Sequence, residues 1–144
     1  MEASDHQFES IQEGQSESYR YAISNPVYEA MTEIFADKCP LHVDTDYARA
    51  SGFAGRVMHG AVLQGFLSHF IGMHFPGRRS ILMSVELRYV KPCYLGDEIR
   101  LSAKVTHKVP SLKAVELALE FHNQTQGLIV ATGKCLVAVR GAGP

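Results

Sequence analysis

The sequence predicts an α+β fold in which a curved antiparallel sheet wraps around one central helix. The helix is indicated by residues 60–73, which are apolar on most sides, as in a helix that is buried. Strands are indicated where apolar and polar side chains alternate, for example from Val115 to Phe121. Four strand-like segments follow the helix with only short turns between them, which favours antiparallel pairing of neighbours. They are residues 80–91, 97–107, 113–123 and 128–140.

One further strand and two helices are expected ahead of the central helix. Residues 15–23 are typical of a polar strand. Asn25-Pro26 is typical of a helix start, and this helix is expected to run to about Ala36. Asp44 would cap a short helix that ends near Ser51. The apolar stripe of the first helix would consist of Val27, Ala30, Met31 and Ile34.

The domain organisation is expected to be simple. A chain of 144 residues can build one domain with a real core but is too short for two ordinary ones. We expect residues 1–12, which are mostly polar, to be disordered and residues 13–144 to form the single domain.

Composition argues against several classes of partner and location. The formal net charge is −1 and no basic cluster stands out, so nucleic acid is not an expected partner. No segment has the roughly 18 consecutive apolar residues of a membrane span, and the N-terminus lacks the features of a signal peptide. Cys39, Cys93 and Cys135 show no Cys-x-x-Cys spacing, which argues against a disulfide framework and indicates a reducing, cytoplasmic setting.

An acid and an imidazole lie five residues apart in the stretch from Asp37 to His42. Such a pair suits general acid–base chemistry, because the carboxylate can take a proton from water while the imidazole orients the water or returns a proton. Pro40 fixes its own φ and keeps Cys39 out of a helical conformation. We therefore expect a bent loop that lets both side chains point at one place.

A second pattern combines Gly52-Phe53 with His59-Gly60, at the point where a glycine-rich loop enters the apolar helix. Free backbone N–H groups at a helix start attract partial negative charge. They could stabilise an oxygen that gains charge in a transition state. Alternatively, Gly60 could serve only close packing of helix and sheet, and His59 could be structural.

These motifs resemble those of the MaoC-like (R)-specific enoyl-CoA hydratases and acyl dehydratases, which have the hot-dog fold. The resemblance covers about residues 20–140 of this chain. Ala36 stands where the family usually has Gly, and Cys39 stands where it usually has Asn. The matching residues are Asp37, Pro40 and His42, then Gly52-Phe53, His59-Gly60, Tyr89-Val90-Lys91-Pro92 and Gly96-Asp97-Glu98-Ile99.

The resemblance implies reversible hydration of a 2-enoyl thioester to an (R)-3-hydroxyacyl thioester, carried on CoA or acyl carrier protein, without a cofactor. Asp37 would accept a proton from water, and His42 would orient that water and help deliver a proton to Cα. The resemblance also implies a homodimer or a larger even oligomer, with two sheets joined edge to edge. The remaining oxyanion and substrate-binding residues would be Gly60, through its N–H, His59, Phe53 and Cys39.

Several alternatives stay open on the sequence alone. Asp37 could cap a helix and His42 could be a half-buried histidine bonded to the backbone. A hot-dog thioesterase would use a carboxylate to direct water at the carbonyl, and a non-catalytic domain would bind an acyl chain or a partner subunit. His42, Asp44 and His59 could approach a metal, but the pattern is a weak one without a recognisable supporting shell, so no metal is expected.

Overall fold

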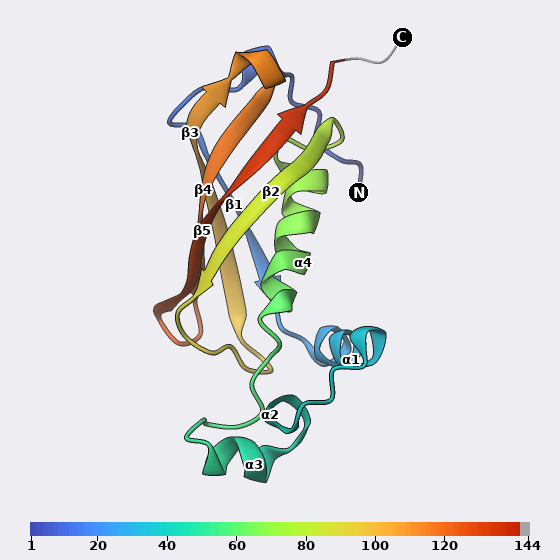
Figure 1. The fold of residues 1–144 in the computed structure, drawn as a ribbon, viewed down its shortest axis with the longest axis vertical. Coiled ribbons are helices and arrows are strands. Elements are labelled where there is room, and N and C mark those ends of the chain that lie inside the picture. The colour runs from blue at the N-terminus through green and yellow to red at the C-terminus, as the bar shows by residue number, and fades with distance from the viewer. Residues whose placement is uncertain (142–144) are drawn as a thin grey trace.

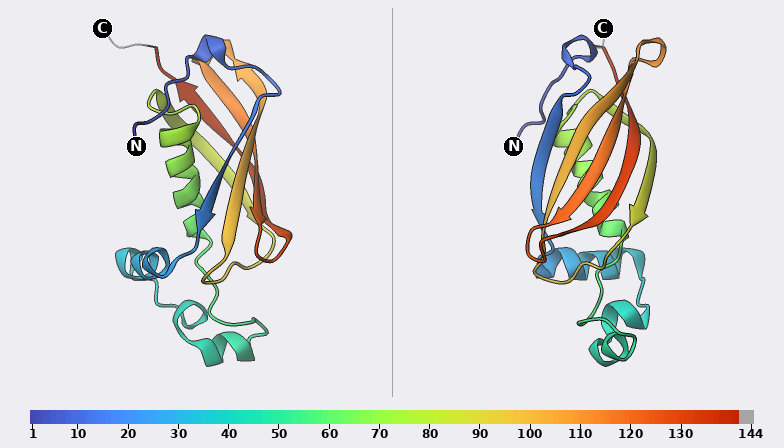
Figure 2. Two further views of the ribbon diagram at one scale, coloured as in Figure 1. Left: turned by 180° about the vertical axis from the view of Figure 1, so that it is seen from behind. Right: turned by 90° about the vertical axis from the view of Figure 1, so that its left-hand side faces the viewer.

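The computed structural model describes residues 1–141 and contains a single five-stranded antiparallel sheet. Its strands are β1 (Ser16–Ala22), β2 (Ser80–Tyr89), β3 (Glu98–Val109), β4 (Ala114–Asn123) and β5 (Leu128–Val139). They lie in the order β1-β3-β4-β5-β2, so β1 and β2 form the two edges. The sheet curls around α4 (Ala61–His69), which lies along its concave face (Figures 1 and 2). The predicted α+β fold and its strands are confirmed.

The core fills the space between the sheet and α4. In β4 buried and partly exposed positions alternate, with Leu117 and Phe121 fully buried. The helix contributes Leu63 and Leu67 from the opposite side. Burying an aliphatic or aromatic side chain of this size stabilises a fold by about 1.5–3 kcal/mol. The alternation read from the sequence therefore identifies the face of the sheet that packs on the helix.

The central helix is buried on one face only. The expectation of a buried helix holds for this face alone and is corrected for the other, where Gln64, Gly65 and Ser68 are exposed. The reason is geometric, because the sheet covers a single side of α4 (Figure 2). A π-helical turn (Phe70–His74) follows the helix. Within the described residues, none of the helices is long and apolar enough to cross a membrane.

Three helices form a separate lobe beyond one end of the sheet (Figure 1). They are α1 (Asn25–Phe35), α2 (Pro40–Val43) and α3 (Thr45–Ala50). Asp44 caps α3 as predicted, since its carboxylate accepts bonds from the N–H groups of Asp46 and Tyr47. The predicted stripe of α1 is wrong in part, because its buried residues are Tyr28 and Thr32 and Ile34 is 73% exposed.

The N-terminal segment packs against the domain. Ser4 N–H donates to the Met73 carbonyl at 3.0 Å, and Ile11 is part of the core with 1% exposure. The expectation that residues 1–12 are disordered is therefore corrected: apolar side chains in an otherwise polar stretch anchor it. The described chain also forms two short 3-10 turns, at Phe8–Ser10 and Pro110–Leu112.

Candidate active site

The segment from Asp37 to His42 is fastened to residues 57–59, just before α4. Val57 N–H donates to the Leu41 carbonyl at 3.0 Å, and His42 Nδ1 donates to the Val57 carbonyl at 2.7 Å. The chain leaves α1 through Ala36, whose φ of 52° turns it sharply, and re-enters helix at Pro40. The expected bend is present, with His42 in the single turn of α2.

Tyr28 of α1 connects the segment that carries His42 to the segment that carries Val57. Its hydroxyl lies 2.7 Å from the His42 carbonyl and 3.0 Å from the Val57 carbonyl. Burial raises the pKa of Tyr28, so the hydroxyl stays protonated as the donor these carbonyls need. The lobe of helices thereby fixes the backbone that carries His42.

One carboxylate lies beside two imidazole rings. Asp37 Oδ2 is 3.8 Å from His42 Nε2 and 3.8 Å from His59 Nε2. The two rings stack with their centroids 3.8 Å apart. The Asp37 side chain is 51% exposed, while those of His42 and His59 are 16% and 5% exposed. The acid is therefore open to solvent and reactants, whereas the two rings beside it are largely buried.

The hydrogen bonds define which atoms can act on a substrate. His42 Nδ1 must be the donor to Val57, because a carbonyl only accepts, so a neutral His42 ring carries its lone pair on Nε2. That lone pair and Asp37 Oδ2 are two acceptors 3.8 Å apart, too far apart to bond to each other. Both can accept from one water molecule, which would be oriented and made more nucleophilic.

The start of α4 offers backbone donors next to this pair. Gly60 has helical angles (φ −56°, ψ −31°), and the first bonds of the turn come from the N–H groups of Val62 and Leu63. The N–H groups of Gly60 and Ala61 precede those bonds and find no backbone acceptor in the described part of the chain. A Cβ at position 60 would lie 3.1 Å from the ring of Tyr89, so glycine also permits this close contact.

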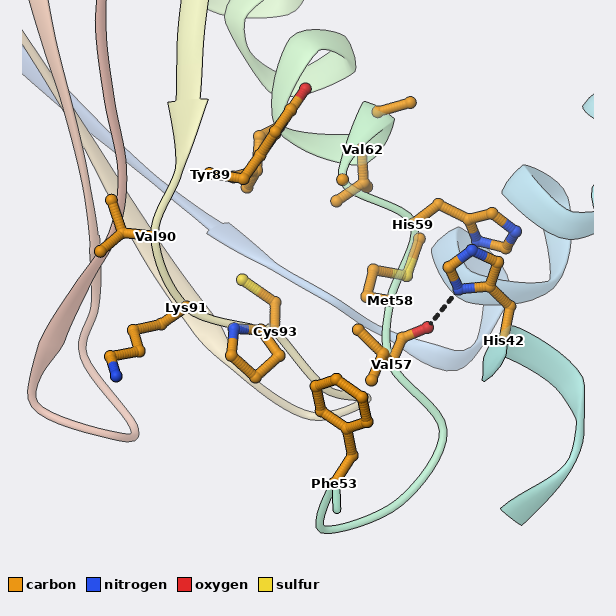
Figure 3. Close-up of a pocket in the computed structure, with 14 residues that line it drawn as sticks. His42, Phe53, Val57, Met58, His59, Val62, Tyr89, Val90, Lys91 and Cys93 are labelled. Atoms are coloured by element: carbon orange, nitrogen blue, oxygen red, sulfur yellow. Dashed lines mark hydrogen bonds between the residues drawn. The ribbon is translucent and has the colours of Figure 1, made fainter. Parts of the chain in front are cut away.

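A cavity of about 540 Å³ opens between the start of α4 and the end of β2 (Figure 3). Its size is within the range of small-molecule sites. Burial, with the nearby negative charge of Asp97, raises the pKa of Cys93 to about 12, so this thiol is a neutral part of an apolar wall. The lining residues are His42, Phe53, the segment 57–63 and the segment 89–93.

The structure brings together most of the predicted site residues. His42, Phe53, His59 and Gly60 line the cavity, and Asp37 lies beside it within reach of both histidines. Cys39 differs from the expectation: its side chain is exposed and absent from the lining, and only its backbone N–H reaches Asp37 Oδ1, at 3.3 Å. Proximity to Asp37 and His42 in sequence therefore does not bring the thiol into the site.

The wall formed by the end of β2 was not predicted from the sequence. Tyr89, Val90 and Cys93 line the cavity, together with Met58 from the segment before α4. The motif Tyr89-Val90-Lys91-Pro92 was the available signal, but nothing in it showed that this strand end would face α4. That proximity depends on the pairing of β2 at the edge of the sheet.

Asp37, His42 and His59 also meet the distance requirement of a metal site, since three ligand atoms lie within 4.8 Å of one another. Their orientation fits a metal poorly. Nitrogen lone pairs lie in the ring planes, and the two rings are stacked with only 27° between their planes, so the lone pairs do not converge on one ion. His59 Nε2 is moreover already bonded to the Asp37 carbonyl.

Comparisons with known proteins agree with this geometry. The profile described as MaoC like domain matches residues 10–122. An (R)-specific enoyl-CoA hydratase of Rhodospirillum rubrum is 33% identical over 138 residues, covering 96% of this chain and 94% of the relative. A 3-hydroxybutyryl-CoA dehydratase of Methylorubrum extorquens is 26% identical over 132 residues, covering 92% and 83%.

Solved structures show the same arrangement of sheet and helix. R-hydratase PhaJ1 of Pseudomonas aeruginosa superposes with a TM-score of 0.88 at 25% identity, over 97% of this chain and 89% of that one. The (R)-hydratase of Aeromonas caviae gives a TM-score of 0.84 at 25% identity, over 91% and 98%. A helix wrapped by one curved sheet, with an acid and a histidine at the helix start, defines a hot-dog protein of the hydratase type. The chain belongs to the MaoC-like family.

Proposed function

We propose that this chain catalyses reversible hydration of a 2-enoyl thioester to an (R)-3-hydroxyacyl thioester, carried on CoA or acyl carrier protein. Its membership of the MaoC-like family, with relatives named as hydratases and dehydratases, makes it a hydro-lyase. One observation carries the assignment of roles. The Asp37 carboxylate faces His42 Nε2 across 3.8 Å, beside an apolar cavity.

In this mechanism a water molecule bonded to Asp37 and His42 adds its oxygen to Cβ of the enoyl group. Asp37 takes the proton that the water loses, and the electron pair of the double bond moves toward the thioester oxygen. The Gly60 N–H stabilises the resulting enolate. The proton that Asp37 has taken is then delivered to Cα with the help of His42, whose Nε2 lone pair can accept it and pass it on. This restores the thioester and completes the addition of one water molecule.

The cavity supports an acyl thioester as substrate. Its wall is built mainly from apolar side chains, including Phe53 and Met58, which suits an acyl chain. The chemistry consists of proton transfers and oxyanion stabilisation, for which the named side chains and amides suffice. The proposal therefore includes no cofactor.

A homodimer, or a larger even oligomer, is part of the proposal. Strand β2 is an edge, and its residues Ile81, Leu82, Met83 and Val85 are 37–50% exposed. An open apolar edge is a template for pairing with another strand, and symmetric pairing is the commonest assembly of soluble proteins. Strand β5 lies inside the sheet between β4 and β2, so it offers no open edge.

The proposed location is the cytoplasm. Cys39, Cys93 and Cys135 are all free thiols, which suits a reducing compartment.

The decisive experiment follows crotonyl-CoA by absorbance of its enoyl-thioester band, with a free-thiol assay on the same sample. Loss of the band without thiol release is the expected result and means hydration. Thiol release would mean a thioesterase, and no reaction over several chain lengths would leave a non-catalytic acyl-binding domain.

A further inference from the structure

His59 is the most constrained side chain of the site. It is 4% exposed and its ring lies flat against that of His42, with the centroids 3.8 Å apart (Figure 3). It immediately precedes Gly60, whose N–H is the proposed oxyanion donor. His59 thus contacts Asp37 and His42 and directly precedes Gly60, the three residues of the proposed mechanism.

The bond from His59 to Asp37 is made to the backbone. Its Nε2 lies 2.9 Å from the Asp37 carbonyl oxygen and must carry the proton, because a carbonyl only accepts. Its Nδ1 is buried and has no partner within the described residues. The bond to the Asp37 carbonyl therefore fixes which ring nitrogen of His59 acts as the donor.

Through this bond Asp37 is held to a distant segment of the chain. The preceding Ala36 has a left-handed backbone, and the bond from Cys39 N–H to the Asp37 carboxylate joins residues only two apart in sequence. That local bond moves with the loop and does not fix it to the rest of the protein. The His59 bond joins the loop to the start of α4, 22 residues further along the chain.

We propose that His59 is a positioning residue, which sets the distance between the Asp37 carboxylate and the His42 ring and acts on the reaction through these two residues. It holds Asp37 through the backbone carbonyl and supports His42 through ring stacking. This inference rests on the proposed function and replaces the expectation that His59 binds substrate. Misplacement of a catalytic group by about 1 Å can cost about 10²-fold in rate.

Three substitutions separate the N–H donor from the ring. His59→Gln places an amide nitrogen about as far along the side chain as Nε2 and keeps the donor. His59→Asn places an amide at the position of Nδ1 and leaves the Asp37 carbonyl without a donor. His59→Phe keeps an aromatic face for His42 but has no N–H. Thermal melts of all three report whether they fold.

The experiment measures kcat and KM with crotonyl-CoA, together with amide hydrogen exchange of residues 36–42 in the same proteins. We expect His59→Asn and His59→Phe to lose about 10²-fold in kcat with KM within about threefold of the wild type. We expect His59→Gln, which keeps the donor but lacks the stacked ring, to lose clearly less kcat than either. We also expect faster exchange at residues 36–42 in the first two variants only, because exchange reports local opening.

The proposal is overturned if folded His59→Asn and His59→Phe match His59→Gln in both kcat and exchange. It is also overturned if the variants raise KM and leave kcat unchanged, since that result means substrate binding. If the wild-type protein does not hydrate any enoyl thioester, the proposed function is refuted, and so is the role of His59 in it. In that case, faster amide exchange of residues 36–42 in the variants would show only that the bond from His59 to Asp37 stabilises the loop.

Discussion

Asp37 and His42 have opposite surroundings, and this difference suits different roles. The half-exposed carboxylate can meet water and substrate, while the His42 ring is fixed by a bond at Nδ1 and by the face of His59. A fixed ring presents Nε2 in one direction only. This arrangement supports the proposed roles of the pair in proton transfer.

Asp37→Asn is expected to remove activity and leave the fold intact, because an amide keeps the shape but cannot accept the proton. The expected loss is about 10²–10⁴-fold in kcat with crotonyl-CoA. His42→Ala should be similarly severe, and the double variant should lose less than the product of the two effects, because the residues act as a unit. Full activity in folded Asp37→Asn would rule out the hydratase mechanism.

Gly60→Pro tests the backbone donor at the start of α4. Proline is compatible with the φ of −56° at this position but has no N–H. Gly60→Ala is the matched control, since it adds a side chain against the Tyr89 ring and keeps the donor. We expect kcat of the proline variant to fall about 10²–10³-fold below that of the alanine variant. Equal kcat values in the two folded variants would argue that the Gly60 N–H is not used.

The three thiols are expected to react very differently with iodoacetamide at pH 8. Burial raises the pKa values of Cys93 and Cys135 to about 12, so almost none of either is thiolate at this pH, whereas Cys39 is exposed. Mass spectrometry of the native protein should show one label per chain, at Cys39. Cys39→Asn should take none and stay active, because the thiol lies outside the cavity lining. Rapid labelling of Cys93 would contradict the buried wall.

Among the elements, α1 matters to the site because it holds the two segments that meet there. Its buried face contains Tyr28 and Thr32, and Tyr28 reaches the carbonyls of His42 and Val57. The helix thus supports the site through a hydrogen-bonding side chain. The sequence pattern of α1 had indicated only apolar packing.

Tyr28→Phe should lower the free energy of unfolding by about 1–3 kcal/mol, because it leaves the His42 carbonyl without this donor, although the Val57 carbonyl keeps its bond from His42 Nδ1. The measurement is urea unfolding beside steady-state kinetics, with Tyr47→Phe as the control, since Tyr47 is 51% exposed. We expect a lower kcat in Tyr28→Phe, and we expect Tyr47→Phe to keep the stability and the kcat of the wild type. If Tyr28→Phe is as stable and as active as the control, α1 does not support the site in this way.

For the whole molecule, the exposed edge at β2 predicts the assembly. Met83→Lys places a charge on this edge and should convert the dimer to a species near the 15.9 kDa mass of one chain. Ile34→Lys is the control, because Ile34 is more exposed than Met83 but lies on α1. Sedimentation at micromolar concentration measures both. A wild-type monomer with full activity would refute the dimer, and dissociation by both variants would argue against the edge as the contact.

The local sequence was enough to predict most of the elements and the bend that brings Asp37 and His42 together, while their acid–base role stays a prediction. Alternation in residues 113–123 and the cap at Asp44 depend on neighbours in the chain, and both predictions match the structure. The spacing of Asp37, Pro40 and His42 likewise indicated a bend, because proline restricts its own backbone and the residue before it.

Contacts between distant segments could be found only from the folded chain. The exposed face of α4, the anchoring of Ile11 and the burial of Tyr28 depend on which distant segments pack against each other. The bond from His59 to Asp37 and the cavity wall at Tyr89 each join segments that pack side by side without a shared local pattern. Short-range backbone preferences set local structure, whereas packing of the whole sheet around one side of the helix sets which side chains meet.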